Sequence, residues 1–483
     1  AMDIGTRSVV GLVVEASPDG CYNILATAKE EHQERAMLGG QIQDVDEVAA
    51  VASKVKQLLE EELDFSLQKV AVAAAGRTLI TICETTEQEV SPWYEIREEQ
   101  ALCLELDAIL QAQQSLVKEH QTSDDYYCVG YSVIAYYLDG RRIGNPIGQR
   151  GKKLAVDLIA TFLPCVVIDS LVAVLERCGL QMDFLTLEPI AAFELVIPPT
   201  MRQLNLALLD IGAGTSDIAV TDQGNVSAHA MVPLAGDAVT EKLCSEYLLD
   251  FIAGEQLKRK LKTKKNLSIK DVLGVRHQVA KTDVLASIKD TVREMAQRIG
   301  KSILELNGRT PQAVICIGGG SLTPELTTEL AVYLGLPAER VAVRKADGIT
   351  SIKGLNRILA GPEGVTPLGI AMMAAQPHSL GLCQVQVNER MVKMFRGNTT
   401  TVADALLAAD IGFSELYGLP GSLLTINVNG EEKLIKGEPG EPAEIHLDGT
   451  PVSLDTPLSP GAVVKVGTPK PGRGAKALVK DVM

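Results

Sequence analysis

The chain has 483 residues, enough for about three domains of roughly 150 residues each and for a core that needs no disulfide or metal. Its 46 basic and 61 acidic residues leave a net charge of −15, which argues against nucleic acid or an anionic surface as the main partner. Aromatic residues make up 4% of the chain, too few for a base-stacking platform. The nine cysteines form no Cys-x-x-Cys pair, so the sequence carries no zinc or redox signature and fits the reducing cytoplasm.

An Asp-Ile-Gly turn followed by an apolar strand stands at the start of the chain and again near its middle. Asp3 and Gly5 map onto Asp210 and Gly212 at a single offset of 207 residues. One copy alone would be an ordinary hairpin turn. Two copies half a chain apart predict two related lobes that face each other.

These turns carry the residue types that bind a polyphosphate. Glycines let backbone N–H groups converge on an anion, and the hydroxyls of Thr6, Ser8 and Thr215 add donors. An aspartate at the entrance of the turn cannot bind phosphate itself, but it can hold a hydrated Mg²⁺ that bridges phosphate groups. The pair of turns therefore predicts a clamp for a polyphosphate and its magnesium ion.

Amphipathic helices alternate with strands along this part of the chain. Apolar residues at helical spacing over 48–59 precede a strand at 69–75, and a second helical face over 284–303 precedes another strand. Between the two turns the sequence also predicts a charged helical segment and two further strands, at 92–120, 126–134 and 154–162. This alternation predicts an α/β fold with a mixed or parallel sheet.

A third motif, Ala313–Ser321, is a buried strand that runs into three consecutive glycines. Thr323 and Pro324 then predict the N-cap and the first residue of a helix over 325–334. A strand, a glycine turn and a helix N-terminus suit the close approach of a flat or anionic ligand. The motif is neither a Walker A loop nor a Gly-x-Gly-x-x-Gly fingerprint.

Taken in order, the two Asp-x-Gly turns and the Gly-Gly-Gly-Ser loop resemble the actin-like ATPase superfamily over residues 1–378. Residues 144–154, 166–179 and 187–192 are most similar to the FtsA cell-division family, with PilM-type pilus-assembly relatives next. The resemblance implies an α/β, two-lobed actin/chaperone-type ATPase fold with an FtsA-like inserted subdomain, followed by a small C-terminal β-rich, β-grasp-like domain. It divides the chain into a lobe I core (1–85 and 164–200), the inserted subdomain (86–163), a lobe II core (201–235 and 312–378), an outer lobe II subdomain (236–311) and the C-terminal module (379–483).

The resemblance also implies a site for ATP or ADP with Mg²⁺ between the lobes. The carboxylates around the metal would be Asp3, Asp210 and Asp217. The contacts to the nucleotide would be Gly5, Thr6, Arg7, Gly212, Gly214, Thr215, Gly236, Glu255, Lys258, Gly318, Gly319, Gly320 and Ser321.

The residues leave alternatives open at four of these positions. Arg7 either reaches phosphate or is a solvated loop cation. Gly236 starts a helix that is either near the nucleotide or an ordinary helix start. Glu255 and Lys258 either touch ribose and base or form an ordinary surface pair on a helix.

Glu188 opens a Glu-Pro-Ile-Ala segment, and the resemblance implies that its carboxylate orients the water that attacks the terminal phosphate. The alternative is a carboxylate that is favoured at a helix N-terminus by the helix dipole. The sequence leaves enzymatic activity open, and the activity expected is at most a slow ATPase.

About 100 residues follow the region of resemblance. They predict a small β-grasp-like module with a helix at 401–409 and strands at 383–387, 391–395, 424–428, 433–435, 445–447, 452–454 and 462–466, with hairpin turns at 429–430 and 448–449. No catalytic constellation stands in it, so protein binding is the expectation. The final segment, 470–480, is basic with little apolar moment, which puts the family's amphipathic membrane helix in doubt.

The leading hypothesis is an FtsA-like protein that binds Mg-ATP to control self-assembly, as a filament or dimer, and to recruit partners such as a tubulin-like division protein in bacterial cell division. The alternative is a non-filament chaperone or reactivating ATPase that uses its C-terminal module as a protein-binding arm. A small-molecule kinase comes third, because no acid stands clearly in a base position. The expected location is the cytoplasm, with peripheral attachment to the inner face of the membrane left open.

Overall fold

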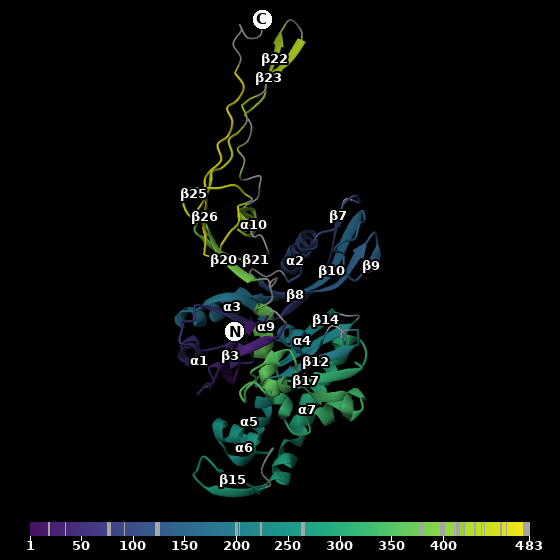
Figure 1. Cartoon of the computed structure of the whole chain (residues 1–483), viewed down its shortest axis with the longest axis vertical. Helices are drawn as coiled ribbons and strands as arrows, with labels where there is room; N and C mark the ends of the chain where they lie inside the picture. The colour runs from purple at the N-terminus through teal and green to yellow at the C-terminus, as the bar shows by residue number, and fades with distance from the viewer. Residues whose placement is uncertain are drawn as a thin grey trace. The chain divides into compact units, whose positions relative to one another are not determined.

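The computed structural model describes residues 1–17, 20–33, 35–74, 79–90, 92–120, 126–198, 201, 203–222, 225–261, 266–375, 381–396, 401–409, 411, 416, 418, 421–428, 431–435, 437–438, 440–454, 456–459 and 461–476. They belong to two compact units, Ala1–Ser379 and Leu380–Met483, and each is described by itself (Figure 1).

The first unit contains two sheets with the same strand topology. The first lobe orders its strands β3-β2-β1-β6-β11, and the second lobe orders its strands β14-β13-β12-β17-β18. In both, an antiparallel three-strand meander continues into parallel strands. The strands of the first lobe are β1 (Met2–Ile4), β2 (Ser8–Ala16), β3 (Tyr22–Glu31), β6 (Lys69–Ala74) and β11 (Gln181–Leu187), with β19 (Ile352–Lys353) beside β3; those of the second are β12 (Leu206–Ile211), β13 (Ser216–Asp222), β14 (Asn225–Val232), β17 (Ala313–Ile317) and β18 (Val341–Val343).

The two Asp-x-Gly turns join the first two strands of each lobe at the same register. Asp3 pairs with Val10 in the first hairpin, and Asp210 pairs with Asp217 in the second. The offset of 207 residues that takes Asp3 to Asp210 therefore also takes Val10 to Asp217. The internal repeat expected from the sequence is one hairpin built twice.

Helices cover both sheets of the first unit. Those associated with the first lobe are α1 (Val45–Leu63), α3 (Cys165–Arg177), α4 (Glu188–Val196) and α9 (Val365–Ala374), and those of the second are α5 (Gly236–Tyr247), α6 (Phe251–Lys260), α7 (Lys281–Asn307) and α8 (Leu326–Leu334). The apolar face predicted over 284–303 belongs to α7 and is buried in the core of the second lobe. Figure 1 shows α5, α6 and the small ribbon β15 (Asn266–Lys270) with β16 (Arg276–Ala280) at one end of this unit.

The inserted segment is a four-stranded sheet that packs against one long helix. Its strand order is β7-β10-β8-β9, and α2 (Glu98–His120) lies against β7 and β10. The strands are β7 (Ile80–Glu89), β8 (Tyr126–Leu138), β9 (Arg141–Ile143) and β10 (Lys153–Pro164). Asp139 and Gly140 adopt positive φ angles of 49° and 78°, as a two-residue hairpin turn requires.

The C-terminal unit builds a five-strand sheet in the order β21-β20-β26-β24-β25, in which β20 and β26 are parallel. Its elements are β20 (Gly381–Val387), β21 (Arg390–Arg396), α10 (Val402–Ala408), β24 (Ile445–Leu447), β25 (Thr450–Pro451) and β26 (Val463–Val466). This is a β-grasp arrangement, so the expected class of the C-terminal domain is confirmed. The strand expected at 452–454 is wrong, because the turn at Asp448-Gly449 brings Thr450 and Pro451 opposite β24.

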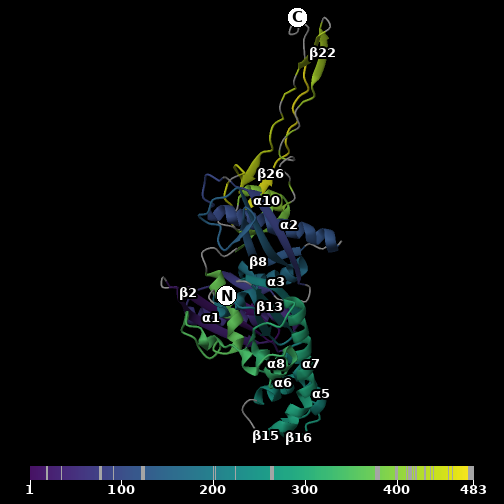
Figure 2. The same ribbon diagram turned by 90° about the vertical axis from the view of Figure 1, so that its right-hand side faces the viewer.

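A separate hairpin, β22 (Leu424–Val428) with β23 (Glu431–Ile435), stands far from this sheet in the same unit, and its expected turn at 429–430 lies outside the described residues (Figure 2). Three segments connect the two, and their described residues are 416, 418, 421–422, 437–438, 440–443 and 470–475. Their hydrogen bonds close a ring: Gly421 N–H donates to Glu438 O (2.9 Å), Glu438 N–H to Arg473 O (2.9 Å) and Ala475 N–H to Ser422 O (3.0 Å). We call these segments the stalk.

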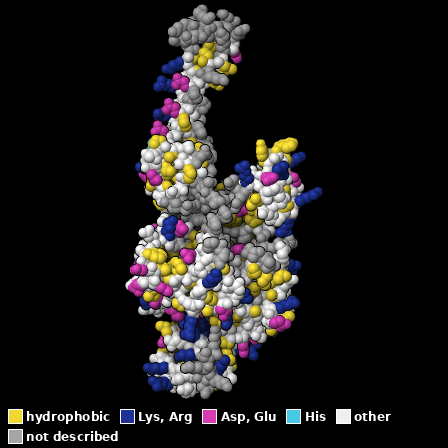
Figure 3. Space-filling view, viewed as in Figure 1, with side chains coloured by type: hydrophobic (Ala, Val, Ile, Leu, Met, Phe, Trp, Pro, Cys, Tyr) yellow, Lys and Arg dark blue, Asp and Glu magenta, His cyan; other side chains and the backbone are white. Residues whose placement is uncertain are grey.

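Glycines make the close packing of the stalk possible. A Cβ on Gly418 would lie 1.9 Å from Lys470 O, one on Gly440 2.1 Å from Gly418 O, and one on Gly472 2.0 Å from Glu438 O. Each segment thus turns glycine toward another segment, as the chains of a collagen triple helix do at their common axis. Charged side chains of both signs line the outside of the stalk (Figure 3), including the pair Lys470 and Glu441 at 3.1 Å.

Across the described residues, no helix combines the length and the apolar character needed to cross a membrane.

Candidate functional site

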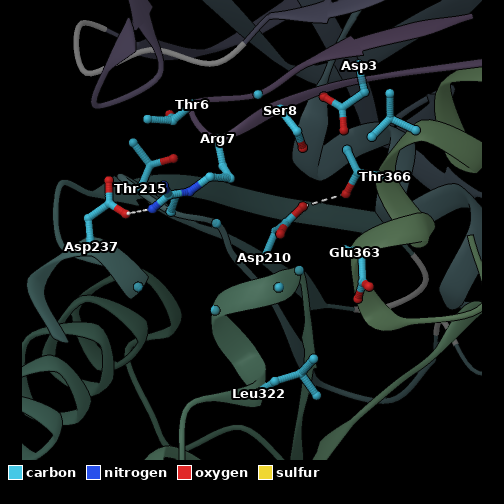
Figure 4. Close-up of a pocket in the computed structure, with 18 of the residues that line it drawn as sticks. Asp3, Thr6, Arg7, Ser8, Asp210, Thr215, Asp237, Leu322, Glu363 and Thr366 are labelled. Carbon is cyan, nitrogen blue, oxygen red and sulfur yellow. Dashed lines mark hydrogen bonds and ion pairs between the residues drawn. The ribbon is translucent and has the colours of Figure 1, made fainter. Parts of the chain in front are cut away.

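A cleft of about 410 Å³ lies between the two lobes of the first unit, and residues from both Asp-x-Gly turns line it (Figure 4). Most of the residues proposed from the sequence line this cleft: Asp3, Gly5, Thr6, Arg7, Glu188, Asp210, Gly212, Thr215, Gly236, Glu255, Lys258, Gly318, Gly319 and Gly320. Three do not line it, namely Gly214, Asp217 and Ser321.

The two Asp-x-Gly turns have the same internal hydrogen bond. Gly5 N–H donates to Ser8 O at 3.1 Å, and Gly212 N–H donates to Thr215 O at 2.9 Å. Gly214 supports this pair from outside the cleft, because a Cβ there would lie 3.2 Å from the Gly39 backbone of the first lobe. The turns are therefore matched loops that meet across the gap between the lobes.

Helix α5 is anchored on the second turn. Gly236 N–H donates to Gly212 O at 3.2 Å, and Asp237 N–H donates to Ala213 O at 2.8 Å. Two of the free N–H groups of the helix N-terminus are used in this way. The start of α5 thus has a structural task and at the same time borders the cleft.

The glycine loop after β17 lies directly on the second turn. A Cβ on Gly320 would be 2.5 Å from Gly212 O, and Gly318 has a φ of 77° that favours glycine. The Ser321 hydroxyl donates to Gly318 O at 2.6 Å and is buried, so it braces the loop from within. The loop presents bare backbone to the cleft at Gly318, Gly319 and Gly320.

The helix start predicted after this loop is wrong. Gly319–Leu322 form a short 3-10 turn, and Thr323 N–H donates to Gly320 O at 3.0 Å. Glu325 then adopts a left-handed φ of 65°, which breaks the helical path, so α8 begins only at Leu326. Thr323 and Pro324 are consequently not the N-cap and first helical residue, and the N-terminus of α8 does not follow directly on the glycines.

Four carboxyl groups gather at the closed end of the site. Asp210 and Asp217 are buried, and the Thr366 hydroxyl of α9 donates to Asp210 Oδ2 at 2.5 Å. Burial raises the pKa of Asp210 to about 6, against the lowering effect of Thr366. Burial and the Asp210 charge raise the pKa values of Asp3 and Asp217. Burial, followed by the charges of Asp3, Asp217 and Asp210, raises the pKa of Glu188 well above its ordinary range.

This donor set fits a hard divalent cation. The groups are all oxygen ligands, and their mutual repulsion is what a cation would relieve. Within the described ranges, no three or more His, Cys, Asp or Glu side chains are arranged to hold a metal by themselves. Mg²⁺ is usually held by one or two carboxylates together with water and phosphate oxygens. Of the four carboxyl groups, Asp3, Asp210 and Glu188 line the cleft.

Glu255 and Lys258 form the other end of the site. Lys258 Nζ lies 2.7 Å from Glu255 Oε2 and donates to Gly236 O at 2.8 Å. Although burial opposes its charge, Glu255 has its pKa held at about 2 by Lys258, Thr240 and Arg7. Glu255 is only 8% exposed, so the interpretation of this pair as an ordinary surface pair is wrong. Arg7 is not a solvated cation either, since it donates to Asp237 Oδ1 at 3.0 Å.

Sequence reasoning missed several residues of the cleft. Thr366 and Glu363 come from the start of α9 and the turn before it, and Lys29 comes from β3. Thr366 lies 156 residues from the aspartate that it contacts and belongs to no glycine motif. Only the fold brings these groups to the site.

The buried carboxyl groups predict how stability depends on pH when no divalent cation is present. Because Asp210 binds its proton more tightly folded (pKa about 6) than unfolded (about 4), the free energy of unfolding falls as pH rises through that window. Urea unfolding in EDTA from about pH 4 to 7, a range that spans both pKa values, should show this fall, and Asp210→Asn should make it shallower. Asp183→Asn, an exposed substitution, is the control. An equally steep fall in Asp210→Asn would contradict the assignment.

The comparisons with known proteins agree with this geometry. The cell division protein FtsA of Pseudomonas aeruginosa is 22% identical over 401 residues, which cover 79% of this chain and 90% of that protein. FtsA of Escherichia coli is 26% identical over 243 residues, and FtsA of Bacillus subtilis is 25% identical over 262, so these matches span 55% and 57% of those relatives. No protein-family model matches the chain.

Among solved structures, the PilM-PilN type IV pilus biogenesis complex aligns with a TM-score of 0.53 at 19% identity, covering 78% of this chain and 98% of that one. The chain is an actin-like ATPase-fold protein related to FtsA. The resemblance inferred from the sequence motifs is thereby confirmed.

Proposed function

We propose that this FtsA-related chain binds Mg-ATP in the interlobe cleft and uses the nucleotide state to control self-assembly and partner recruitment in bacterial cell division. The observation that carries the proposal is the pair of Asp-x-Gly hairpins at one register, both lining a single cleft beside the glycine loop. Two facing glycine turns, which let backbone approach an anion closely, suit the β- and γ-phosphates of a nucleotide. The curated relatives that this chain resembles are cell division proteins.

Each end of the cleft has its own task in this proposal. The turns at Gly5 and Gly212, with the hydroxyls of Thr6 and Thr215, would receive the phosphates. Asp3 and Asp210 would hold Mg²⁺, which neutralises phosphate charge when bound. Asp217 is the buried cross-strand partner of Asp210 and is hydrogen-bonded to Thr215.

The glycine loop, with Glu255 and Lys258, would receive the nucleoside. The bare backbone at Gly318, Gly319 and Gly320 allows a flat base to approach closely. Glu255 and Lys258 line the same cleft and are held in place by Thr240 and Gly236.

Glu188 is the proposed catalytic residue for slow hydrolysis. It opens α4, lines the cleft and lies close enough to Asp3, Asp210 and Asp217 for their charges to raise its pKa. Neutralising those charges would let Glu188 ionise and accept a hydrogen bond from an attacking water. Helix-dipole stabilisation at the first turn of α4 is compatible with this role.

Removal of one metal carboxylate tests the proposal. In calorimetric titration, Asp210→Ala should bind Mg-ATP at least about tenfold more weakly than the parent chain. The variant should remain folded, because it takes one charge out of a repelling group of acids. Asp183→Ala, an exposed aspartate on β11, should bind like the parent. Parent-like affinity in Asp210→Ala would remove the basis for the site.

A sedimentation experiment separates the two functions that this site could serve. Pelleting and electron microscopy with Mg-ATP, Mg-ADP and EDTA should show nucleotide-dependent assemblies if the protein acts as an FtsA-type polymer. The second candidate, a chaperone or reactivating ATPase, is favoured by the folded β-grasp unit with its own core and stalk. It predicts nucleotide binding without assemblies under any of these conditions.

A further inference from the structure

Three arginines cross between the lobes at the rim of the cleft. Arg7 and Arg35 reach from the first lobe to α5 and α6, and Arg259 reaches from α6 back to the first lobe. We call these arginines and the side chains they contact the interlobe clasp.

Arg7 makes three contacts on the second lobe. Its Nη2 lies 3.0 Å from Asp237 Oδ1 and 3.4 Å from Glu255 Oε2, and its guanidinium lies 4.8 Å from the centre of the Phe251 ring. The Arg7 side chain is 22% exposed, so these interactions are partly shielded from water. Figure 4 shows the Arg7 side chain reaching from the first turn toward Asp237.

Arg35 contacts the same aromatic ring. Its guanidinium lies 4.2 Å from the centre of Phe251, and its Nη2 lies 2.5 Å from Glu241 Oε1. Phe251, the first residue of α6, is thus held by two arginines from the opposite lobe. Cation–π contacts of this kind add to the ion pairs and are less sensitive to salt.

Arg259 makes the reverse crossing. Its Nη1 lies 2.9 Å from Glu31 Oε1 at the end of β3, and its Nε lies 3.0 Å from Glu255 Oε1. Glu255 therefore contacts Arg7 and Arg259 as well as Lys258. Exposed ion pairs are individually weak, but here they share partners, and separating the lobes at this rim breaks together all those that join the first lobe to α5 and α6.

We propose that the interlobe clasp sets the rate at which nucleotide leaves the cleft. The inference rests on the proposed nucleotide site, and it assigns Phe251, Arg35, Glu31 and Glu241 as positioning residues. None of these four lines the cleft, so they act on the lobes rather than on the ligand. They hold α5 and α6, and α5 begins at the second Asp-x-Gly turn, so opening the clasp withdraws that turn from the first lobe.

Release kinetics of the full chain test the proposal. A fluorescent ATP analogue, preloaded with Mg²⁺ and chased with excess ATP, should leave Phe251→Leu about tenfold faster than the parent, while its association rate changes less than about twofold. Glu31→Gln should release it about twofold faster. Phe65→Leu and Asp183→Asn change an exposed phenylalanine and an exposed ion pair away from the rim and should match the parent. A parent-like release rate in Phe251→Leu would overturn the proposal.

Hydrogen exchange separates this test from the nucleotide site. Without nucleotide, the amides of α5 and α6 should exchange faster in Phe251→Leu than in the parent, whereas those of α7 should not change. If the parent chain fails to bind the ATP analogue, the proposed function fails. If the amides of α5 and α6 exchange at the parent rate in Phe251→Leu, the proposed role of the interlobe clasp is overturned, whether or not the chain binds nucleotide.

Discussion

Replacing Gly318 by alanine is expected to destabilise the first unit by about 3 kcal/mol and to weaken Mg-ATP binding by about two orders of magnitude. The new Cβ would lie 2.2 Å from Asp210 Oδ1 and 2.4 Å from Ile211 O, and the residue has a φ of 77° that alanine rarely adopts. Both the metal carboxylate and the second turn must move to make room. Urea unfolding and calorimetric titration measure the two effects.

The neighbouring glycine supplies a control for stability. A Cβ on Gly319 meets nothing nearer than Glu363 Cβ at 4.0 Å, so Gly319→Ala should unfold within about 0.5 kcal/mol of the parent. Equal stability of Gly318→Ala and Gly319→Ala would mean that the loop is not packed against the second turn as the structure has it. If Gly318→Ala loses stability but binds Mg-ATP like the parent, the glycine loop supports the fold and is not part of the nucleotide site.

Local chemistry explains why the sequence predicted the two hairpins so well. Asp3 and Gly5 recur as Asp210 and Gly212 in one spacing, and a turn of that kind fixes the register of its hairpin through its own hydrogen bond. The strands around them are short apolar runs bounded by turn residues. Both the α/β class and the facing turns could therefore be derived without the fold.

Contacts between distant segments could not be derived in this way. Thr366 reaches Asp210 from α9, and Arg35 of the first lobe pairs with Glu241 of α5, yet no spacing in the sequence relates the members of either pair. Glu255 and Lys258 are three residues apart, which is equally typical of a solvated surface pair. Only the burial of this pair against Thr240 and Gly236 distinguishes it from a solvated surface pair.

The helix start after the glycine loop shows a different limit. Thr323 and Pro324 are good starting residues by preference, but the structure places a left-handed residue, Glu325, after them. The loop must follow the second turn closely, with Gly320 directly on Gly212, and this tertiary constraint outweighs the local preference. The stalk escaped the sequence reasoning because its segments have neither the strand nor the helix period.

Replacing Gly421 by alanine is expected to unfold the stalk while leaving the rest of the chain intact. The new Cβ would lie 1.9 Å from Arg473 O and 2.8 Å from Gly474 N, so it meets backbone that cannot rotate away. Gly421 N–H also donates to Glu438 O, and a displaced segment loses that bond as well. The cost, about 3 kcal/mol, exceeds what three thin segments with few apolar side chains can absorb.

Limited proteolysis read by mass spectrometry is the measurement. Cleavage within residues 416–475 should become faster in Gly421→Ala, while fragments of the first unit appear at the parent rate. Gly474→Ala is the matched control, because its Cβ would meet only the Ser422 Oγ, at 2.7 Å, and that hydroxyl can rotate away. If Gly421→Ala and the parent resist proteolysis equally, glycine is not needed where the three segments of the stalk pack together. A glycine-packed stalk of this kind would serve as a stiff spacer that holds the β22–β23 hairpin clear of the β-grasp sheet.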